Sequence, residues 1–423
     1  MSNAATLAPV DPPAPGQGHA DETTNWVQKI IRTFFSPSAG TVALAILGAL
    51  VIGALIVVFF DPQVQATMGY FFQRPGDFFS EAGRAFSSFF SALVRGAIFD
   101  WTQPTFAKAI RPATESIVRA IPLIIAGLAI ALSFTAGLFN IGVQGQIILG
   151  AIFGGYVGLA LNLPPFVHLL VAILAAVIGG ALWGFIPGIL KAQLGANEVI
   201  VTIMLNSIAL LLLQALLNTE AFHGTGYAGK SMPVGPNAVY PLLMGSGFRL
   251  HVGFLVAILA AVFLWWLLDR STFGFELRAA GANPEAANTA GINVKRTMML
   301  TLVLSGALAG LAATAPVLGT EKGLSVGLAG TIGFDAITVA LLGKSRPMGV
   351  FFAGLLFGAL NAGGALMQSS AGIPVDIVQI TQAIIVLMIA GSEAVRWMRQ
   401  RRKQDQQTVE KVEVSASKEG AVA

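Results

Sequence analysis

The sequence predicts an all-α polytopic membrane protein with about ten transmembrane helices. Only 11% of its 423 residues are charged and 55% are apolar, against roughly 25% and 45–50% in an average soluble domain. The mean hydropathy is +0.74. The apolar residues form long unbroken runs of about 20, the length that a helix needs to cross a bilayer, and not the alternating segments of a β-barrel. This pattern excludes a soluble enzyme, a disordered scaffold and a nucleic-acid binder, despite the formal charge of +4.

The two ends of the chain differ in composition from the part between them. Residues 1–28 are rich in Pro, Gly and small polar residues, so we expect a disordered cytoplasmic leader. Residues 29–395 are expected to form the membrane domain, and 396–423 a basic, then mixed-charge, cytoplasmic tail. No signal peptide is expected, because the first apolar run starts about 40 residues in and lacks a small-residue cleavage site.

Ten apolar segments are expected to cross the membrane. The first, 40–60, ends at Asp61-Pro62. Segments 144–162 and 326–343 are glycine-rich, and the second of these carries Asp335. The other expected spans are 119–139, 167–190, 197–218, 250–269, 298–318, 347–367 and 374–395.

The basic residues of the short loops predict the orientation, because such residues collect on the cytoplasmic side. With ten spans, all these loops fall on one side, and both termini fall on that side too. The basic positions are Lys29, Arg32, Lys191, Arg270, Arg278, Lys295, Arg296, Lys344, Arg346, Arg396, Arg399, Arg401, Arg402 and Lys403.

Segment 61–118 is expected on the outer side, and its five basic residues are balanced by five acidic ones. Its run 78–101 places aromatic and apolar residues at helical spacing. The run is therefore expected to form either an amphipathic helix along the outer membrane interface or a packed extracellular cap.

No catalytic residue, metal site or cofactor site is expected in this chain. Gly224 to Ser231, "GTGYAGKS", matches the phosphate-loop pattern, but that loop needs a strand before it and a helix after it. Here a membrane helix precedes it and Met232-Pro233 follows, so we interpret it as an external glycine-rich loop. The four histidines are scattered, and the absence of cysteine excludes disulfides and thiolate metal sites.

Seven polar side chains within or beside the expected spans are candidates for lining a translocation pathway. Polar groups in lipid usually face the interior of a bundle, and glycine-interrupted segments are where broken helices open to a substrate cavity. The alternative is that these groups bond to one another and hold helices together. They are Asn140, Gln144, Gln146, Glu198, Thr202, Asn206 and Asp335.

The longest cytoplasmic loop, 270–297, is expected to carry a short helix between the sixth and seventh spans. Asn283 is a suitable helix cap and Pro284 suits the first helical position. Gly291 is expected to end the helix. Such a helix either presses on a cytosolic partner or serves as a connector.

Four segments of the chain resemble one known family. "LRAAGANPEAANTAGINV" (277–294) resembles the cytoplasmic coupling loop of permease subunits of sugar-type bacterial ATP-binding-cassette (ABC) importers. Segments 122–151 and 190–209 resemble the nucleoside and simple-sugar branch of these branched-chain amino acid/ribose permease-like proteins, and 333–360 resembles their C-terminal half. Gln144 stands where family members often carry Glu.

The resemblance implies a permease subunit in the bacterial cell (inner or plasma) membrane that imports a nucleoside or simple sugar. It implies a cytoplasmic ABC ATPase, a second permease that is homologous or identical, an extracytoplasmic substrate-binding protein, a small-molecule substrate and the lipid bilayer as partners, without nucleic acid. ATP hydrolysis then belongs to the partner. The alternative is an ion- or proton-coupled secondary transporter, for which Glu198 and Asp335 are the candidate titrating carboxylates. The residues implied in coupling to the ATPase are Arg278, Gly281, Asn283, Pro284, Glu285, Ala286, Ala287 and Gly291.

Overall fold

The computed structural model describes residues 37–223, 229–374, 376–389 and 391. The chain divides into two units, 49–390 and 1–48 with 391–423. Of the smaller unit, the described part is the first half of helix α2 and residue 391. The expected leader (1–28) and tail (396–423) lie outside the described residues, as does most of the glycine-rich loop 224–231.

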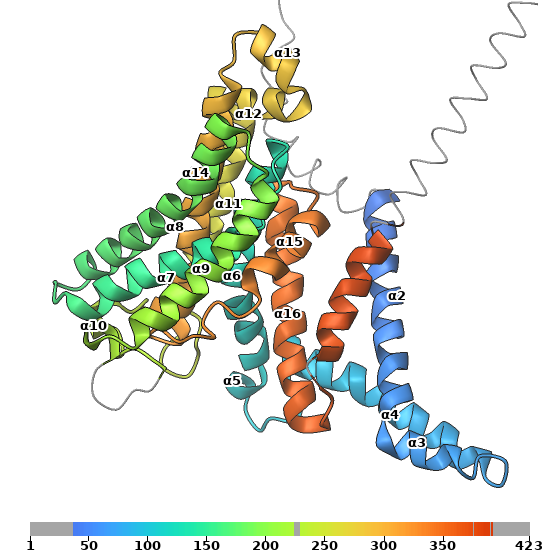
Figure 1. Ribbon diagram of the computed structural model, residues 1–423. Helices are drawn as coiled ribbons and strands as arrows, with labels where there is room; N and C mark the ends of the chain where they lie inside the picture. Colours follow the sequence, from blue (N-terminus) through green and yellow to red (C-terminus); the bar gives the residue numbers. More distant parts are fainter. Residues whose placement is uncertain (1–36, 224–228, 375, 390, 392–423) are drawn as a thin grey trace, which may run out of the picture. The chain divides into compact units, whose positions relative to one another are not determined.

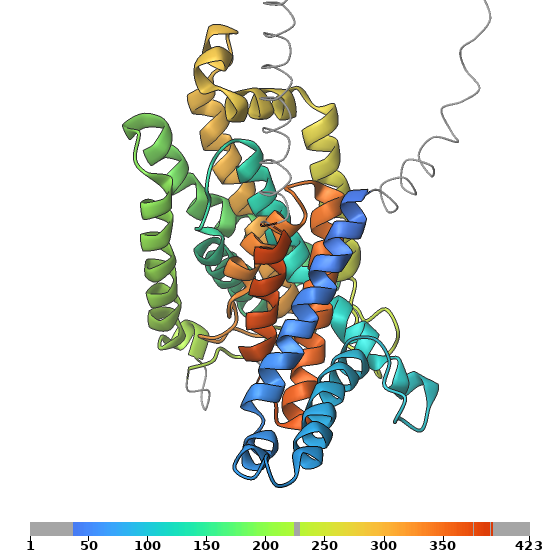
Figure 2. The same cartoon turned by 90° about the vertical axis from the view of Figure 1, so that its right-hand side faces the viewer.

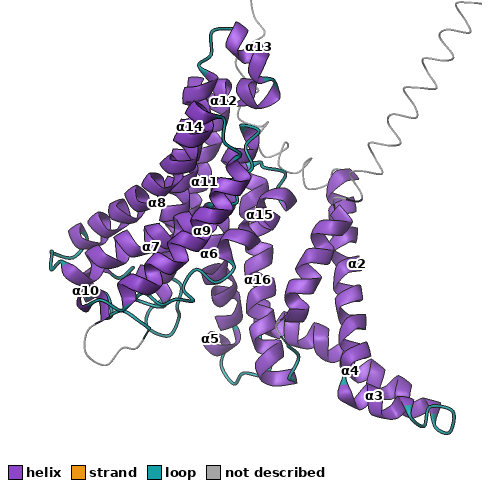
Figure 3. Ribbon diagram, in the orientation of Figure 1, coloured by secondary structure: helices purple, strands orange, loops and turns teal. Residues whose placement is uncertain are grey.

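The described residues form helices and loops and contain no strand (Figure 3). Two isolated bridges, Lys230 with Ser325 and Leu242 with His251, link loops. The helices are α2 Pro37–Phe60, α3 Pro62–Met68, α4 Pro75–Ala97, α5 Phe106–Ala109, α6 Arg111–Thr135, α7 Val143–Ala160, α8 Val167–Leu194, α9 Glu198–Leu217, α10 Glu220–His223, α11 Gly253–Arg270, α12 Thr272–Ala282, α13 Pro284–Thr289, α14 Val294–Thr314, α15 Ile332–Leu342 and α16 Pro347–Ala371, followed by a helix over Asp376–Ile389.

A helix occupies each of the ten segments that the sequence marks as spans, within the described residues. Eight of the described helices are long and apolar enough to cross a membrane. The other two, α15 and the described helix Asp376–Ile389, are shorter. The all-α fold and the multi-pass character are confirmed, whereas the count of ten crossings stays a prediction.

Helix α6 forms the centre of the larger unit, where it packs against α16, α14, α15 and α11 (Figure 1). In the most apolar stretch of this helix 83% of the residues are buried, against 22% in the corresponding stretch of α9. Ile121, Ile124 and Ile125 are fully buried. α16 approaches this helix closely because it presents glycine: a Cβ on Gly354 would lie 2.5 Å from Cγ1 of Ile124.

Helices α8 and α14 cross with their backbones in direct contact. Gly180 and Gly184 of α8 face Gly306 and Gly310 of α14, each pair four residues apart, the spacing that lets membrane helices approach closely. A Cβ on Gly180 would overlap the carbonyl oxygen of Gly306, and one on Gly306 would overlap that of Gly180. No side chain larger than hydrogen fits at this crossing.

The outward faces of α8 and α9 are apolar. On α8, Leu174, Ile178 and Leu182 are about half exposed and recur every four residues. Ile203 and Leu211 of α9 are exposed in the same way. An apolar stripe of this length is a liability in water, but in a bilayer it is the surface that lipid solvates.

Helix α4 accounts for most of the expected amphipathic run, although it starts and ends a few residues earlier than 78–101. Its apolar face is covered by protein. Phe89 approaches Gly53 in the second half of α2, and Leu93 approaches Gly363 of α16. Gly53 also lies close to Thr381 of the helix Asp376–Ile389. Figures 1 and 2 show these four elements side by side. For the buried face of α4, this packing favours the cap over the membrane interface.

Three features were not expected from the sequence. The loop 270–297 contains a second helix, α12, whose N-cap Ser271 accepts a hydrogen bond from the Gly274 amide at 2.9 Å. α14 continues as a π-helical turn over Ala315–Thr320. α6 begins at Arg111, eight residues before the predicted start of that span.

Candidate transport and coupling site

The polar site is built around the junction 136–142 between α6 and α7. Asn140 is buried there, and its Oδ1 accepts a hydrogen bond from the Gly142 amide at 3.0 Å. Its Nδ2 donates to Oγ of Ser305 in α14 at 2.9 Å and to Oε1 of Gln146 at 3.2 Å. Ser305 in turn donates to the carbonyl of Ala129 in α6 at 2.8 Å. The junction is thus tied to α6, α7 and α14 by side-chain amides and one hydroxyl.

Gln144 connects the start of α7 to the segment before α15. Its Nε2 donates to the carbonyl of Gly330 at 2.8 Å, and its Oε1 accepts from the amide of Gly333, also at 2.8 Å. A Cβ on Gly333 would lie 2.5 Å from Cα of Gln144. The amide therefore satisfies one donor and one acceptor of the loop at once.

The three predicted pathway residues of α9 share one face, as their four-residue spacing predicts, and all three contact the junction. Glu198 pairs with Lys191 at 2.8 Å and accepts from the Phe139 backbone. Thr202 is fully buried beside Gly142. Asn206 accepts from the Gly145 amide at 2.8 Å and donates to the Ile141 carbonyl at 3.0 Å.

Six of the seven predicted pathway residues therefore meet at one place. Asp335 lies apart, in the first turn of α15, and accepts from the hydroxyl of Thr331 at 2.9 Å. The amides of Asn140, Gln144 and Asn206 are engaged with other protein groups, an arrangement that holds helices together. Contact of these residues with a substrate stays a prediction.

Two residues of this region were missed by sequence reasoning. Ser305 is fully buried, and the only signal for it was a hydroxyl inside an apolar span. Trp183 of α8 has a buried Nε1 without a hydrogen-bond partner in the described part of the chain. Its Nε1 lies 3.0 Å from the position that a Cβ on Gly145 would take, beside Asn206. An unbonded buried donor is uncommon, and this one points at the junction.

The predicted short helix of the loop 270–297 is present as α13. Oδ1 of Asn283 accepts from the amides of Glu285 and Ala286, both at 3.0 Å. Pro284 occupies the first turn, and Gly291 has the positive φ of 86° that suits a glycine after a helix end. The capping and stop residues are confirmed, whereas contact of this helix with an ATPase stays a prediction.

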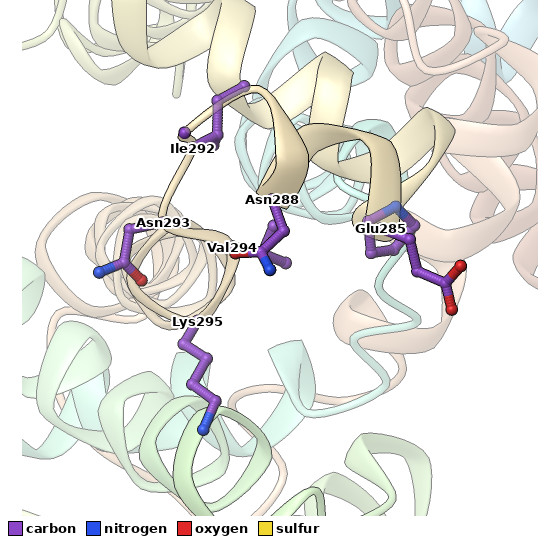
Figure 4. Close-up of a pocket in the computed structure, with 8 residues that line it drawn as sticks. Glu285, Asn288, Ile292, Asn293, Val294 and Lys295 are labelled. Atoms are coloured by element: carbon purple, nitrogen blue, oxygen red, sulfur yellow. The ribbon is translucent and has the colours of Figure 1, made fainter.

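An open hollow of about 540 Å³ lies beside α13 and the first turn of α14 (Figure 4). Glu285 and Asn288 line it from α13 and Lys295 from α14, and all three are exposed. Figure 4 shows Glu285 and Lys295 well apart. With Asn293, which also lines it, the hollow presents one carboxylate, two amides and one ammonium group to a partner.

Two of the predicted coupling residues are packing residues. A Cβ on Gly281 would overlap the carbonyl oxygen of Thr135, so α12 rests directly on the end of α6. Ala287 is buried. Arg278 lies 4.0 Å from Asp269 of α11. The exposed coupling candidates are Arg278, Asn283, Pro284, Glu285, Ala286 and Gly291.

The coupling loop and the polar junction touch each other. A Cβ on Gly137, which has a φ of 71°, would lie 3.3 Å from the carbonyl oxygen of Gly281 and 3.4 Å from its Cα. Gly137 is three residues from Asn140. A displacement of α12 therefore reaches the hydrogen-bonded junction through backbone contact, without an intervening side chain.

Comparison with known proteins identifies the family of this chain and several relatives. Residues 113–391 match the family described as branched-chain amino acid transport system, permease component. The chain is 43% identical over 288 residues to the guanosine ABC transporter permease protein NupP of Bacillus subtilis (strain 168), covering 67% of this chain and 82% of that protein. It is 38% identical over 285 residues to the nucleoside permease protein NupB of Lactococcus lactis subsp. cremoris (strain MG1363), covering 64% and 76%.

A third relative is archaeal. The chain is 37% identical over 289 residues to the glucose ABC transporter permease protein TsgB13 of Haloferax volcanii, covering 66% of this chain and 76% of that protein. The family match over 113–391 includes the polar junction, α12, α13 and the glycine crossing of α8 and α14. This chain belongs to the permease-component family of branched-chain amino acid transport systems.

Proposed function

We propose that this chain is the permease subunit of an ABC importer and forms the translocation pathway for a nucleoside or a simple sugar. The observation that carries the proposal is the backbone contact between Gly281 of α12 and Gly137 of the polar junction. It joins the exposed surface suited to a cytosolic partner to the cluster of polar groups inside the bundle. The relatives, named as guanosine, nucleoside and glucose permeases, support the substrate class.

The proposed mechanism is alternating access driven by ATP hydrolysis in a partner ATPase. α13 docks on that ATPase and moves with it when the nucleotide-bound dimer closes. α12 carries the movement to the end of α6 and to the junction, where Asn140, Gln144 and Asn206 are bonded to α14, to the start of α15 and to α7. Rearrangement of these hydrogen bonds opens the pathway on one side and closes it on the other.

The side chains at the junction suit an uncharged, polyhydroxylated solute. Amides and hydroxyls offer donors and acceptors that can be exchanged for those of a sugar or a ribose. The carboxylate at the junction, Glu198, is paired with Lys191, and Asp335, which lies apart from the junction, accepts a hydrogen bond from Thr331. Trp183 adds a free N–H and an aromatic face, the type of surface on which sugars and bases stack.

The proposal includes the remaining partners and the location. A second permease, homologous or identical, completes the pathway, and an extracytoplasmic binding protein delivers the substrate. The chain lies in the bacterial cell membrane with α12 and α13 on the cytoplasmic side, as the basic loop residues predict. Both termini are then cytoplasmic.

Transport assays test the function. Proteoliposomes that contain this chain, its partner permease and ATPase, and the binding protein should take up labelled guanosine or glucose only when ATP is present. Uptake should stop with a hydrolysis-deficient ATPase and persist after a protonophore collapses the ion gradients. Uptake that needs no ATPase and ends with the gradient would instead favour the secondary transporter, with Glu198→Gln and Asp335→Asn as the variants to examine.

Trp183→Phe tests the pathway assignment, because it removes the N–H and keeps an aromatic ring. We expect substrate uptake to fall several-fold with at most a small loss of thermal stability, because the smaller ring loses some packing but the N–H forms no hydrogen bond with the described residues. Trp265→Phe, on the exposed face of α11, is the matched control. Unchanged uptake by Trp183→Phe would remove this residue from the pathway.

A further inference from the structure

A second hollow of about 280 Å³ lies at the opposite end of the bundle from α12 and α13. It is formed where the end of α4 and the short helix α5 meet the first turns of α6 and the C-terminal part of α16. Most of its wall precedes residue 113, where the family match begins. The hollow is thus formed between the family core and a segment outside the family match.

The wall of this hollow is rigidly built around Asp100. This buried carboxylate accepts from Nε of Arg95 at 2.8 Å, from Oγ1 of Thr102 at 2.7 Å and from Nε2 of Gln103 at 2.9 Å. Its own amide donates to the Ala109 carbonyl at 2.9 Å. The loop between α4 and α5 is therefore held in one conformation and presents its basic neighbours in fixed positions.

The charges that line the hollow do not cancel. Asp100 is paired with Arg95, and Glu115 pairs with Arg249 at 3.4 Å. Lys108, Arg111 and Arg119 also line the hollow. All three are exposed, and none forms an ion pair with a described carboxylate. Three uncompensated cations thus converge on one concave surface.

Of the three unpaired basic residues, Arg119 lies furthest into the apolar stretch Phe106–Thr135. It follows Arg111 by eight residues on the same face of α6, which places it about 12 Å further along the helix. Ionisable residues within membrane helices normally have a partner or face an aqueous cavity. Arg119 has no such partner among the described residues and lines the open hollow instead, where an anion can reach it.

The floor of the hollow is apolar. Ala362, Ala365 and Leu366 of α16 form it, two turns from the end of that helix. Nearby, the loop after α4 and the start of α5 carry exposed aromatic residues, namely Phe99, Trp101 and Phe106, and aromatic residues gather where a bilayer meets water. A basic rim over an apolar floor matches a ligand with an anionic head and an apolar tail.

We propose that this hollow binds the phosphate headgroup of an anionic phospholipid. Lys108, Arg111 and Arg119 hold the phosphate, with Arg119 reaching up from within the span, and the acyl chains lie along α16. On the proposed orientation the lipid belongs to the outer leaflet. The binding itself does not depend on the transport function, and its test uses no transport assay.

Lipid retention by the purified full-length chain tests the proposal. The protein is extracted into detergent, exposed to equal amounts of phosphatidylglycerol and phosphatidylcholine, and examined by native mass spectrometry. The wild type should retain phosphatidylglycerol in preference. Each of Arg111→Gln and Arg119→Gln should lower that preference about fivefold, the effect of one cation near an anionic lipid surface.

Arg74→Gln is the matched control, because it removes an exposed arginine from the same outer segment but outside the hollow. Its lipid preference should equal that of the wild type. Ala365→Leu keeps every charge and fills the floor, so it should also lower the preference. Unchanged circular dichroism and gel-filtration profiles establish that each variant is folded.

Three results would overturn the assignment. An equal loss of phosphatidylglycerol preference with Arg74→Gln would mean that the net charge of the protein, and not this hollow, sets the preference. Displacement of phosphatidylglycerol by excess inorganic phosphate, with no loss on Ala365→Leu, would indicate a free phosphate ion as the ligand. Arg119→Gln that keeps its lipid preference but captures less of the binding protein would indicate an acidic protein surface instead.

Discussion

Gln144 uses both halves of its amide, and this has a testable consequence. A carboxylate at the same position can accept from the Gly333 amide but cannot donate to the Gly330 carbonyl, 2.8 Å away. Because Gly330 is exposed, we expect Gln144→Glu to destabilise the protein by about 0.5–1.5 kcal/mol, the usual net contribution of one hydrogen bond. The midpoint of thermal unfolding in detergent measures this.

Gln193→Glu, at an exposed position near the end of α8, is the control for the added charge. It should leave the midpoint unchanged. If both variants behaved like the wild type, the two hydrogen bonds of Gln144 would not contribute to stability.

Asp100 predicts a pH dependence of stability. The hydrogen bond from the Arg95 guanidinium, with those from Gln103 and Thr102, holds the pKa of this carboxyl well below its usual range. A carboxyl with a lowered pKa in the folded state stabilises the protein above its unfolded value of about 3.9 and loses this contribution as the pH falls further. Asp100→Asn should therefore unfold at a lower temperature than the wild type from neutral pH down to about pH 4, and the difference should narrow below that value.

Thermal unfolding across this pH range measures the effect. Glu220→Gln, at an exposed carboxylate without an ion pair in the described chain, should show no such difference. A gap between Asp100→Asn and the wild type that widens on acidification would have the wrong sign for this explanation.

For single residues, the sequence predicts the contacts of a side chain when its partner lies within a few positions along the chain. The cap of Asn283 joins amides two and three residues away, and four-residue spacing placed Glu198, Thr202 and Asn206 on one face. The prediction fails where the partner is distant. Asn140 and Ser305 are 165 positions apart, and nothing in either neighbourhood indicates that α14 brings the hydroxyl to the junction.

Helices α12 and α13 differ in what a substitution tests. Glu285→Arg changes an exposed charge beside the hollow of α13, so we expect normal thermal stability but a lower rate of substrate-stimulated ATP hydrolysis in the assembled complex. Gly281→Val forces α12 away from the Thr135 carbonyl, and overpacking of this kind costs about 1–3 kcal/mol. It should lower stability and coupling together.

The two variants are compared by thermal unfolding and by ATPase assays on the same preparations. Arg270→Glu, at the exposed end of α11, controls for a reversed charge outside the hollow. Wild-type coupling by Glu285→Arg would argue against α13 as the docking helix.

The elements themselves were largely predictable because long apolar runs have few alternatives in a membrane. α12 was missed because its sequence carries Gly274 and Gly281, which are poor helix formers. Both glycines are there for packing: a Cβ on Gly274 would overlap the Leu267 carbonyl. Tertiary contact overrides local propensity at this point, and a single sequence does not reveal such contact.

For the whole molecule, composition and loop charges predicted the fold class and an orientation. The segment before residue 113 was less predictable, because its charges balance and its amphipathic pattern fits either lipid or protein. The contacts of Phe89 and Leu93 with Gly53 and Gly363 depend on the three-dimensional path of α2 and α16. The hollow beside Arg119 likewise exists only once α4, α6 and α16 are assembled.

The glycine crossing of α8 and α14 limits how this molecule can change shape. Two backbones in direct contact cannot slide without collision between Gly180 and Gly306. We therefore expect α8 and α14 to move together as a rigid pair. α9 is bound to its neighbours mainly through exchangeable amide hydrogen bonds, and most of its surface faces outward. On the proposed alternating-access mechanism, the change between inward- and outward-open states is a displacement of α9 against this rigid pair of helices.

Distances between paired spin labels measure this directly, and the chain has no native cysteine to remove. Labels at Ile178→Cys in α8 and Val303→Cys in α14 should keep their separation between nucleotide-free and ATP-bound complexes. Labels at Ile178→Cys and Ile208→Cys in α9 should not. The reverse result would make the crossing a hinge, and the four glycines would then be the axis about which the permease turns.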